Sequence, residues 1–93
     1  MNNKKLNNIR KKIDILDYKL LNVIKNRTNL VNKVIKTKRF KKQIVDKARI
    51  KKVLSNIKKL SKKKKMDTLL TRKIWISMIN SYIDYERRNF KKK

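Results

Sequence analysis

The residue that departs most clearly from its surroundings is Arg27. Val23 precedes it and Leu30 follows it in steps of four and three, which place residues on one face of an α-helix. A guanidinium in such an apolar seam is costly unless an anion satisfies it. Taken alone, an arginine of this kind is more often part of a structural ion pair than of a ligand site.

Two further cations bear on the anion that Arg27 would bind. Lys38 lies eleven residues later, about 20° around a helix and roughly 16 Å along it, so both side chains share a face. Arg10 borders the same stripe about 25 Å before Arg27. One helix cannot bring Arg10 and Arg27 to one small ligand, so we predict that Arg10 reaches the site of a second, antiparallel subunit.

Acidic partners for these cations are few. The sequence has six acids against 31 Lys and Arg residues, and Glu86 is the only glutamate. Asp46 and Arg49 form either a local ion pair or the mouth of a site, and Glu86 either a salt-bridge partner or a site residue. Several inward cations without carboxylate partners predict that the missing anion is the ligand, and that the site is a cavity for a small dianion.

Composition excludes several other chemistries. Cys and His are absent, which excludes disulfides and thiolate metal sites and removes the usual general base. We therefore expect no metal and no cofactor. The net charge is +25, which suggests an anionic partner. Lys, Asn and Ile make up about half of the chain, however, and all three have AT-rich codons, so composition bias explains most of the bulk charge.

Helices must position these side chains, because Gly and Pro, which punctuate turns, are both absent. Three helices are predicted within a single domain spanning 1–93: 4–39, 46–61 and 67–89. Asp46 and Asp67 suit the N-caps of the second and third helices. The lysine-rich stretch 61–65 is predicted to be a solvated connector.

The apolar faces of the helices predict how they are covered. The first helix has a heptad-like seam: Leu6, Ile9, Ile13, Leu16, Leu20 and Val23. At roughly 50 Å, this helix is too long for 93 residues to cover alone, so a second copy of the chain is the simplest partner. The fold class is therefore all-α, an intertwined helical homodimer. The inner face of the third helix is predicted from the same spacing: Leu70, Ile74, Ser77, Met78, Ser81, Tyr82 and Tyr85, widened by Trp75 and Ile79.

An ordered set of motifs runs through nearly the whole chain. They are Leu6-x-x-Ile9-Arg10-x-x-Ile13-Asp14-x-x-Asp17, Asn26-Arg27-x-x-Leu30, Val34-x-x-x-Lys38, Ile44-Val45-Asp46-x-x-Arg49 and Tyr82-x-x-x-Glu86. This set resembles the all-helical chorismate mutases, including the mutase domain fused to prephenate dehydratase. The resemblance implies a pericyclic rearrangement of chorismate to prephenate in phenylalanine and tyrosine biosynthesis, without nucleophile, metal or redox cofactor.

The resemblance also implies roles for the matched residues. Arg10 from one subunit and Arg27 from the other would bind the carboxylates of chorismate. Lys38 would contact a carboxylate and the ether oxygen of the breaking bond. Glu86 would donate a hydrogen bond to the same oxygen, which it can do only when protonated. Activity is then expected to fall as pH rises.

Three further positions complete the implied substrate site. Asp46 and Arg49 would line the region around the ring hydroxyl and a carboxylate. Many family members have Glu after this arginine, whereas Ile50 follows here, and Tyr82 stands where Ser is common. The isochorismate-pyruvate lyases share the fold and can carry an aromatic residue at that point, so lyase activity is an alternative.

Two alternatives lie outside the family. A basic, non-enzymatic nucleic-acid-binding module is favoured by the charge and by residues 58–65, but the cations that break the pattern point inward and no groove-reading motif is evident, so we expect no specific nucleic acid. A structural coiled-coil dimer gives no reason for Arg27. Residues 1–12 are polar, no apolar core follows, and no run is long enough to span a membrane, so we expect a cytoplasmic protein without a membrane partner.

Overall fold

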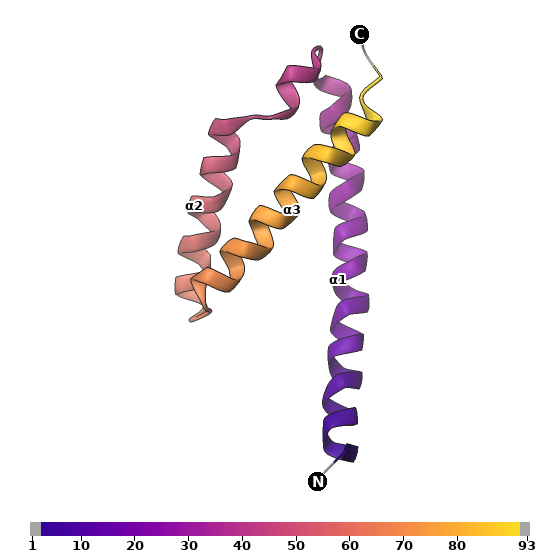
Figure 1. Ribbon diagram of the computed structural model, residues 1–93, viewed down its shortest axis with the longest axis vertical. Helices are drawn as coiled ribbons and strands as arrows, with labels where there is room; N and C mark the ends of the chain where they lie inside the picture. Colours follow the sequence, from indigo (N-terminus) through magenta and orange to yellow (C-terminus); the bar gives the residue numbers. More distant parts are fainter. Residues whose placement is uncertain (1–2, 92–93) are drawn as a thin grey trace. The chain divides into compact units, whose positions relative to one another are not determined.

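The protein is described by a computed structural model over residues 3–91, in which the chain is helical almost throughout (Figure 1). Its elements, in order, are α1 (Asn3–Thr37), a short 3-10 turn η1 (Lys41–Ile44), α2 (Lys47–Lys63) and α3 (Thr68–Asn89). These described residues contain three α-helices and no strand. The predicted all-α class with one long and two shorter helices is therefore confirmed.

The chain divides into two compact units, 1–33 and 34–93. The first consists of α1 up to Lys33. Its apolar seam lies open along the helix, with side chains between 44% and 62% exposed: Leu6, Ile9, Ile13, Leu16, Leu20 and Val23. A single 35-residue helix cannot bury its own apolar face, because burial takes a second element packed against that face.

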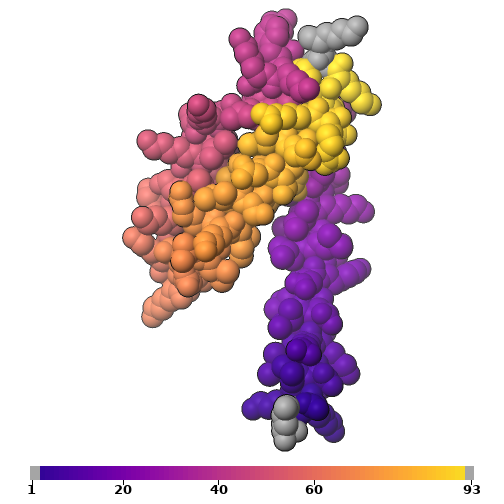
Figure 2. Space-filling model, in the orientation of Figure 1, coloured from indigo at the N-terminus to yellow at the C-terminus, as the bar shows by residue number. Residues whose placement is uncertain are grey.

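The second unit contains the last turn of α1, then η1, α2 and α3. Helices α2 and α3 pack against each other as a hairpin, and α3 also contacts η1. In the space-filling view their side chains lie against one another along the hairpin (Figure 2). Among the apolar residues described, only Ile35 and Ile44 are buried.

Aspartates begin both helices of the hairpin, as the sequence predicted. Asp46 accepts a hydrogen bond from the backbone N–H of Arg49 at 3.0 Å. Asp67 accepts from the N–H groups of Leu69 and Leu70 at 2.8 and 3.2 Å. These bonds satisfy N–H groups that have no partner inside the helix, and the negative charge suits the positive end of the helix dipole.

The turn between α2 and α3 is made without glycine. The N–H of Met66 donates to the carbonyl of Ser61 at 2.9 Å, and that of Lys64 to Leu60 at 3.0 Å. Lys65 takes the left-handed conformation with φ 57°. Glycine usually occupies this position after a helix, but the sequence has none. A lysine therefore takes a conformation that its Cβ disfavours.

The connector predicted at 61–65 is wrong in its first half. Helix α2 continues to Lys63, and Ser61 is buried within it. Its hydroxyl lies 2.7 Å from that of Thr71 on α3, which is also buried. This hydroxyl pair joins the two helices next to their turn, so what reads as a polar connector is part of the helix contact.

The predicted inner face of α3 is also partly wrong. Leu70 and Ile74 are 54% and 47% exposed, and Ser77 and Ser81 are exposed as well. The covered stripe is instead buried or half-buried in steps of three and four: Thr71, Trp75, Met78, Ile79, Tyr82 and Glu86. Both ends of this stripe are polar. The spacing of apolar residues alone therefore predicts a face about a quarter-turn away from the observed one.

Candidate active site

The structure brings together two of the predicted site residues, Lys38 and Glu86, which are 48 positions apart in sequence. The Nζ of Lys38 lies 3.3 Å from Oε1 of Glu86. The same Nζ donates to the carbonyl oxygen of Ile44 at 3.4 Å. Their side chains are only 16% and 11% exposed, so this ion pair is largely shielded from water and its hydrogen bonds are stronger than they would be on the surface.

Lys38 is held at the point where α1 ends. Its N–H donates to the carbonyl of Ile35 at 3.2 Å. Ile35 and Ile44 are the two buried apolar residues, and both contact Lys38. The carbonyl oxygen of Ile35 accepts from the backbone N–H of Lys38, and that of Ile44 accepts from its ammonium. Glu86 reaches the same point from the last turns of α3. The charged pair thus lies beside the two buried apolar residues of the described chain.

Gln43 fixes the turn that follows Lys38. Its Oε1 accepts hydrogen bonds from the N–H groups of Arg39 and Phe40 at 2.7 and 2.9 Å. The backbone between Lys38 and Ile44 is thereby tied to itself. Sequence reasoning missed this residue, because its partners are backbone groups and a capping box is normally announced by Ser or Thr at the position that Phe40 occupies.

Asp46 and Arg49 lie at the start of α2, and both are exposed. The Asp46 carboxylate is engaged in capping the helix through the Arg49 N–H. The recorded bond between them is thus to the backbone of Arg49, which leaves the guanidinium available for other contacts. A role for either residue in binding a substrate stays a prediction.

Tyr82 lies one turn before Glu86 on α3 and is half-buried. Its ring packs edge to face on that of Tyr85, with centroids 6.2 Å apart and planes at 83°. This geometry suits the charge distribution of aromatic rings. Two packed aromatic rings therefore directly precede Glu86 on the helix that carries it.

Arg10 and Arg27 belong to the first unit. Arg10 is exposed and Arg27 is half-buried on α1. They lie on one continuous helix, about 25 Å apart along its axis. The structure thus keeps both from sharing one small ligand within the same helix, and their assignment to two different subunits stays a prediction.

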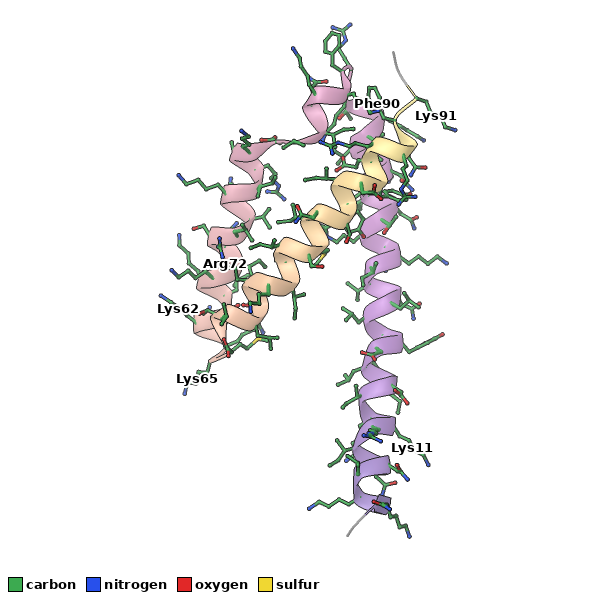
Figure 3. The ribbon with its side chains drawn as sticks, viewed as in Figure 1. Lys11, Lys62, Lys65, Arg72, Phe90 and Lys91 are labelled. Carbon is green, nitrogen blue, oxygen red and sulfur yellow. The ribbon has the colours of Figure 1, made fainter. Side chains whose placement is uncertain are left out.

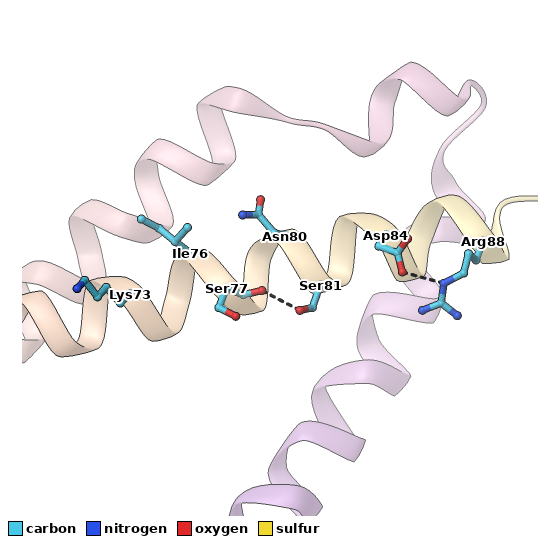
Figure 4. Close-up of a pocket in the computed structure, with 7 residues that line it drawn as sticks. All are labelled: Lys73, Ile76, Ser77, Asn80, Ser81, Asp84 and Arg88. Carbon is cyan, nitrogen blue, oxygen red and sulfur yellow. Dashed lines mark hydrogen bonds and ion pairs between the residues drawn. The ribbon is translucent and has the colours of Figure 1, made fainter.

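A separate cavity lies along α3. An open groove of about 790 Å³ runs along α3 and includes Ser77, Ser81, Asp84 and Arg88 (Figure 4). Asp84 and Arg88 form an exposed ion pair at 2.9 Å. Glu86 is two residues from Asp84, which is about 200° around the helix, so the groove opens on another face of α3 from the Lys38–Glu86 pair. Neither Lys38 nor Glu86 lines this groove, so it is not the candidate site.

Residues 3–91 contain no group of three or more His, Cys, Asp or Glu side chains that could hold a metal ion. Over the same residues, no helix has both the length and the apolar character needed to cross a bilayer.

The described residues are thus all-helical, with a shielded ammonium–carboxylate pair, and the sequence has no Cys or His. In a comparison with protein families, the family model for chorismate mutase type II matches residues 9–87. The chain therefore belongs to the chorismate mutase type II family, a family of isomerases. No curated protein and no solved structure matches it.

The family assignment confirms the resemblance seen in the sequence. The matched range begins just before Arg10 and ends just after Glu86, so every candidate residue lies inside it.

Proposed function

We propose that this protein is a chorismate mutase, which rearranges chorismate to prephenate for phenylalanine and tyrosine biosynthesis. The observation that carries the proposal is the shielded pair of Lys38 and Glu86, 3.3 Å apart at the end of α1. Two groups this close can hydrogen-bond one ligand oxygen from two sides. The reaction needs such a site, because negative charge grows on the ether oxygen as the C–O bond breaks.

The reaction makes few demands on side-chain chemistry. One C–O bond breaks and one C–C bond forms within the same molecule, so no proton or electron passes to the protein. The protein must hold the flexible dianion in its compact, reactive conformer and present fixed donors to the ether oxygen. Arginine suits the first task, since its guanidinium binds a carboxylate through two parallel hydrogen bonds.

Lys38 is the first donor to the ether oxygen. An ammonium has three N–H bonds, and the contacts with Glu86 and Ile44 use two of them. The third is left to point at a ligand. Because Ile44 O and Glu86 already fix Nζ, the donor is in place before the substrate arrives, which is the condition for electrostatic stabilisation of a transition state.

Glu86 is the second donor, and its carboxyl must be protonated for that role. In the ion pair it is an ionised acceptor. Once protonated it donates one O–H hydrogen bond and still accepts one from Lys38.

We propose further that the active form is a homodimer in which Arg10 of one chain completes the site of the other, beside Arg27. The open apolar seam of α1 supports this, since contiguous apolar surface of this kind marks an interaction site. Mixing separately inactive Arg10→Ala and Arg27→Ala chains tests it. Mixed dimers contain one site with both arginines, so random exchange restores roughly one quarter of the parental sites. If no activity returns although mixed dimers form, Arg10 acts within its own chain.

A direct assay tests the reaction itself. Purified protein is given chorismate, its loss is followed and the product is identified. Lys38→Ala is expected to lower kcat/KM by about a hundredfold or more, as loss of a preorganised donor does. The matched control Lys41→Ala removes an exposed cation from the neighbouring turn η1 and is expected to change little. If the parent forms no prephenate, or both variants lose activity equally, the proposal is wrong.

One observation favours a second reaction. Tyr82 places an aromatic ring one turn from Glu86, where the related isochorismate-pyruvate lyases can carry one. The same assay with isochorismate distinguishes the two activities. Release of pyruvate at a higher kcat/KM than prephenate formation from chorismate would assign the site to the lyase reaction.

A further inference from the structure

A cationic groove runs along one side of the α2–α3 hairpin, away from the candidate active site. Two adjoining cavities of about 310 and 460 Å³ form it. They share Leu54 and Lys58 of α2 and Arg72 of α3. Figure 3 labels Arg72 on this hairpin, with Lys62 and Lys65 near its turn.

The floor of the groove is apolar. Ile50, Leu54 and Ile57 of α2 are half-buried along the contact with α3, and Leu69 is 59% exposed at its end. When an apolar side chain of a ligand packs on this floor, the apolar surfaces of both the ligand and the groove are removed from water. The groove therefore offers a hydrophobic contribution to binding as well as an electrostatic one.

The rim of the groove carries positive charge alone. Its ionisable lining residues are four cations: Lys47, Lys51, Lys58 and Arg72. None of the four makes an ion pair with another residue of the described chain. Four like charges within one groove repel each other, so their arrangement is stabilised by an anionic occupant.

The basic rim of the groove lies on the flank of α2 opposite Arg49, and neither Lys38 nor Glu86 lines the groove. Lys51 is two residues from Arg49, which is about 160° around the helix. Lys47 and Lys58 fall near Lys51 on the same flank, at roughly 40° and 20° from it. An occupant of the groove therefore would not meet Arg49 or a substrate beside it.

We infer that this groove docks an acidic, amphipathic helical segment of a partner protein. Lys47 to Lys58 spans eleven residues, or roughly 16 Å, which matches about three turns of a helix with Glu or Asp beside an apolar stripe. A second copy of this chain offers the basic rim few acidic partners, since it has six acids against 31 Lys and Arg residues, and the homodimer proposed above uses the apolar seam of α1 instead. A nucleic acid would engage the rim through phosphates but gain little from the apolar floor.

Two synthetic peptides of about 18 residues serve as probes. One has Leu and Glu at helical spacing, and the other has the same composition in scrambled order. Binding is measured by fluorescence anisotropy at about 0.15 M salt, where exposed long-range charge is screened. The parent protein is expected to bind the amphipathic peptide at least about tenfold more tightly than the scrambled one.

Matched variants locate the binding. Lys58→Glu with Arg72→Glu is expected to remove the tenfold preference, whereas Lys11→Glu with Lys25→Glu makes the same charge change on exposed positions of α1 and is expected to keep it. Leu69→Ser tests the floor without changing charge and is expected to weaken the amphipathic peptide alone. Its control is Leu60→Ser, on the other flank of α2 and 50% exposed.

Several outcomes would overturn the inference. Equal affinity for both peptides, or equal losses in the two charge-reversal pairs, would show attraction to bulk charge only. Tighter binding of an RNA oligonucleotide at the same salt, lost with Lys58→Glu and Arg72→Glu, would assign the groove to nucleic acid. Turnover of chorismate is measured alongside and is expected to be unchanged in all these variants, so failure here is distinguishable from failure of the proposed mutase activity.

Discussion

Replacement of Glu86 by Gln is the change that most directly tests the proposed chemistry. Glutamine keeps an Oε1 acceptor for Lys38 at the observed 3.3 Å and carries N–H donors at every pH. The parent carboxyl can donate to the ether oxygen only when protonated. The variant is therefore expected to be active at high pH, where the parent is not.

The size of the effect follows from the contribution of one donor. One preorganised donor to a developing oxyanion contributes about 10²–10³ in kcat, so Glu86→Ala is expected to fall below Glu86→Gln by that factor. A carboxyl that must be protonated to donate is lost as a donor as pH rises, whereas an amide donates at any pH.

The assay is kcat/KM for chorismate from about pH 5 to about pH 8 for parent, Glu86→Gln and Glu86→Ala. A flat profile for Gln against a falling one for the parent supports Glu86 as the donor. Two results would refute it: the same slope in the parent and in Glu86→Gln, or equal activity of the Gln and Ala variants. Glu86 would then serve only to hold Lys38.

The remaining predictions concern residues that position the site. Gln43→Ala frees the turn after Lys38 and is expected to lower kcat by roughly tenfold with little change in KM, while Gln43→Glu, which keeps the acceptor, restores most of it. Thr71→Val leaves the buried Ser61 hydroxyl without its partner and is expected to cost about 1–3 kcal/mol of unfolding free energy by urea titration; the double change with Ser61→Ala should cost less than the two single changes added. Lys65→Gly relieves the left-handed lysine and is expected to raise the unfolding free energy by roughly 0.5–1 kcal/mol, whereas Lys64→Gly, with ordinary φ, should lower it.

The sequence predicted the helices well because their signals are local. Asp46 and Asp67 start helices by bonding backbone groups two or three residues away, and such caps can be recognised in any sequence. The period of the apolar residues is equally local. Both depend on neighbours along the chain and not on the fold.

The predicted inner face of α3 failed for a physical reason. The spacing of apolar residues marks every apolar helix face, whether the residues that bury it belong to the same chain or to another. Leu70 and Ile74 are on such a face yet stay exposed in one chain, while Thr71 and Glu86 line the contact within the chain through polar bonds. Polar pairs across helices involve residues distant in sequence, so no spacing rule announces them.

The same distinction separates the cations that bear on function from those that do not. A count of 31 Lys and Arg residues says little, since exposed charges are tolerated at almost any surface position. Lys38 stands out because it is shielded, fixed by two acceptors and bordered by buried Ile35 and Ile44. Removing water from a charge costs free energy, so a shielded cation persists only where an interaction stabilises it. That requirement singles out Lys38 at the end of α1, rather than the lysine-rich turn after α2, as the cation on which the proposed function depends.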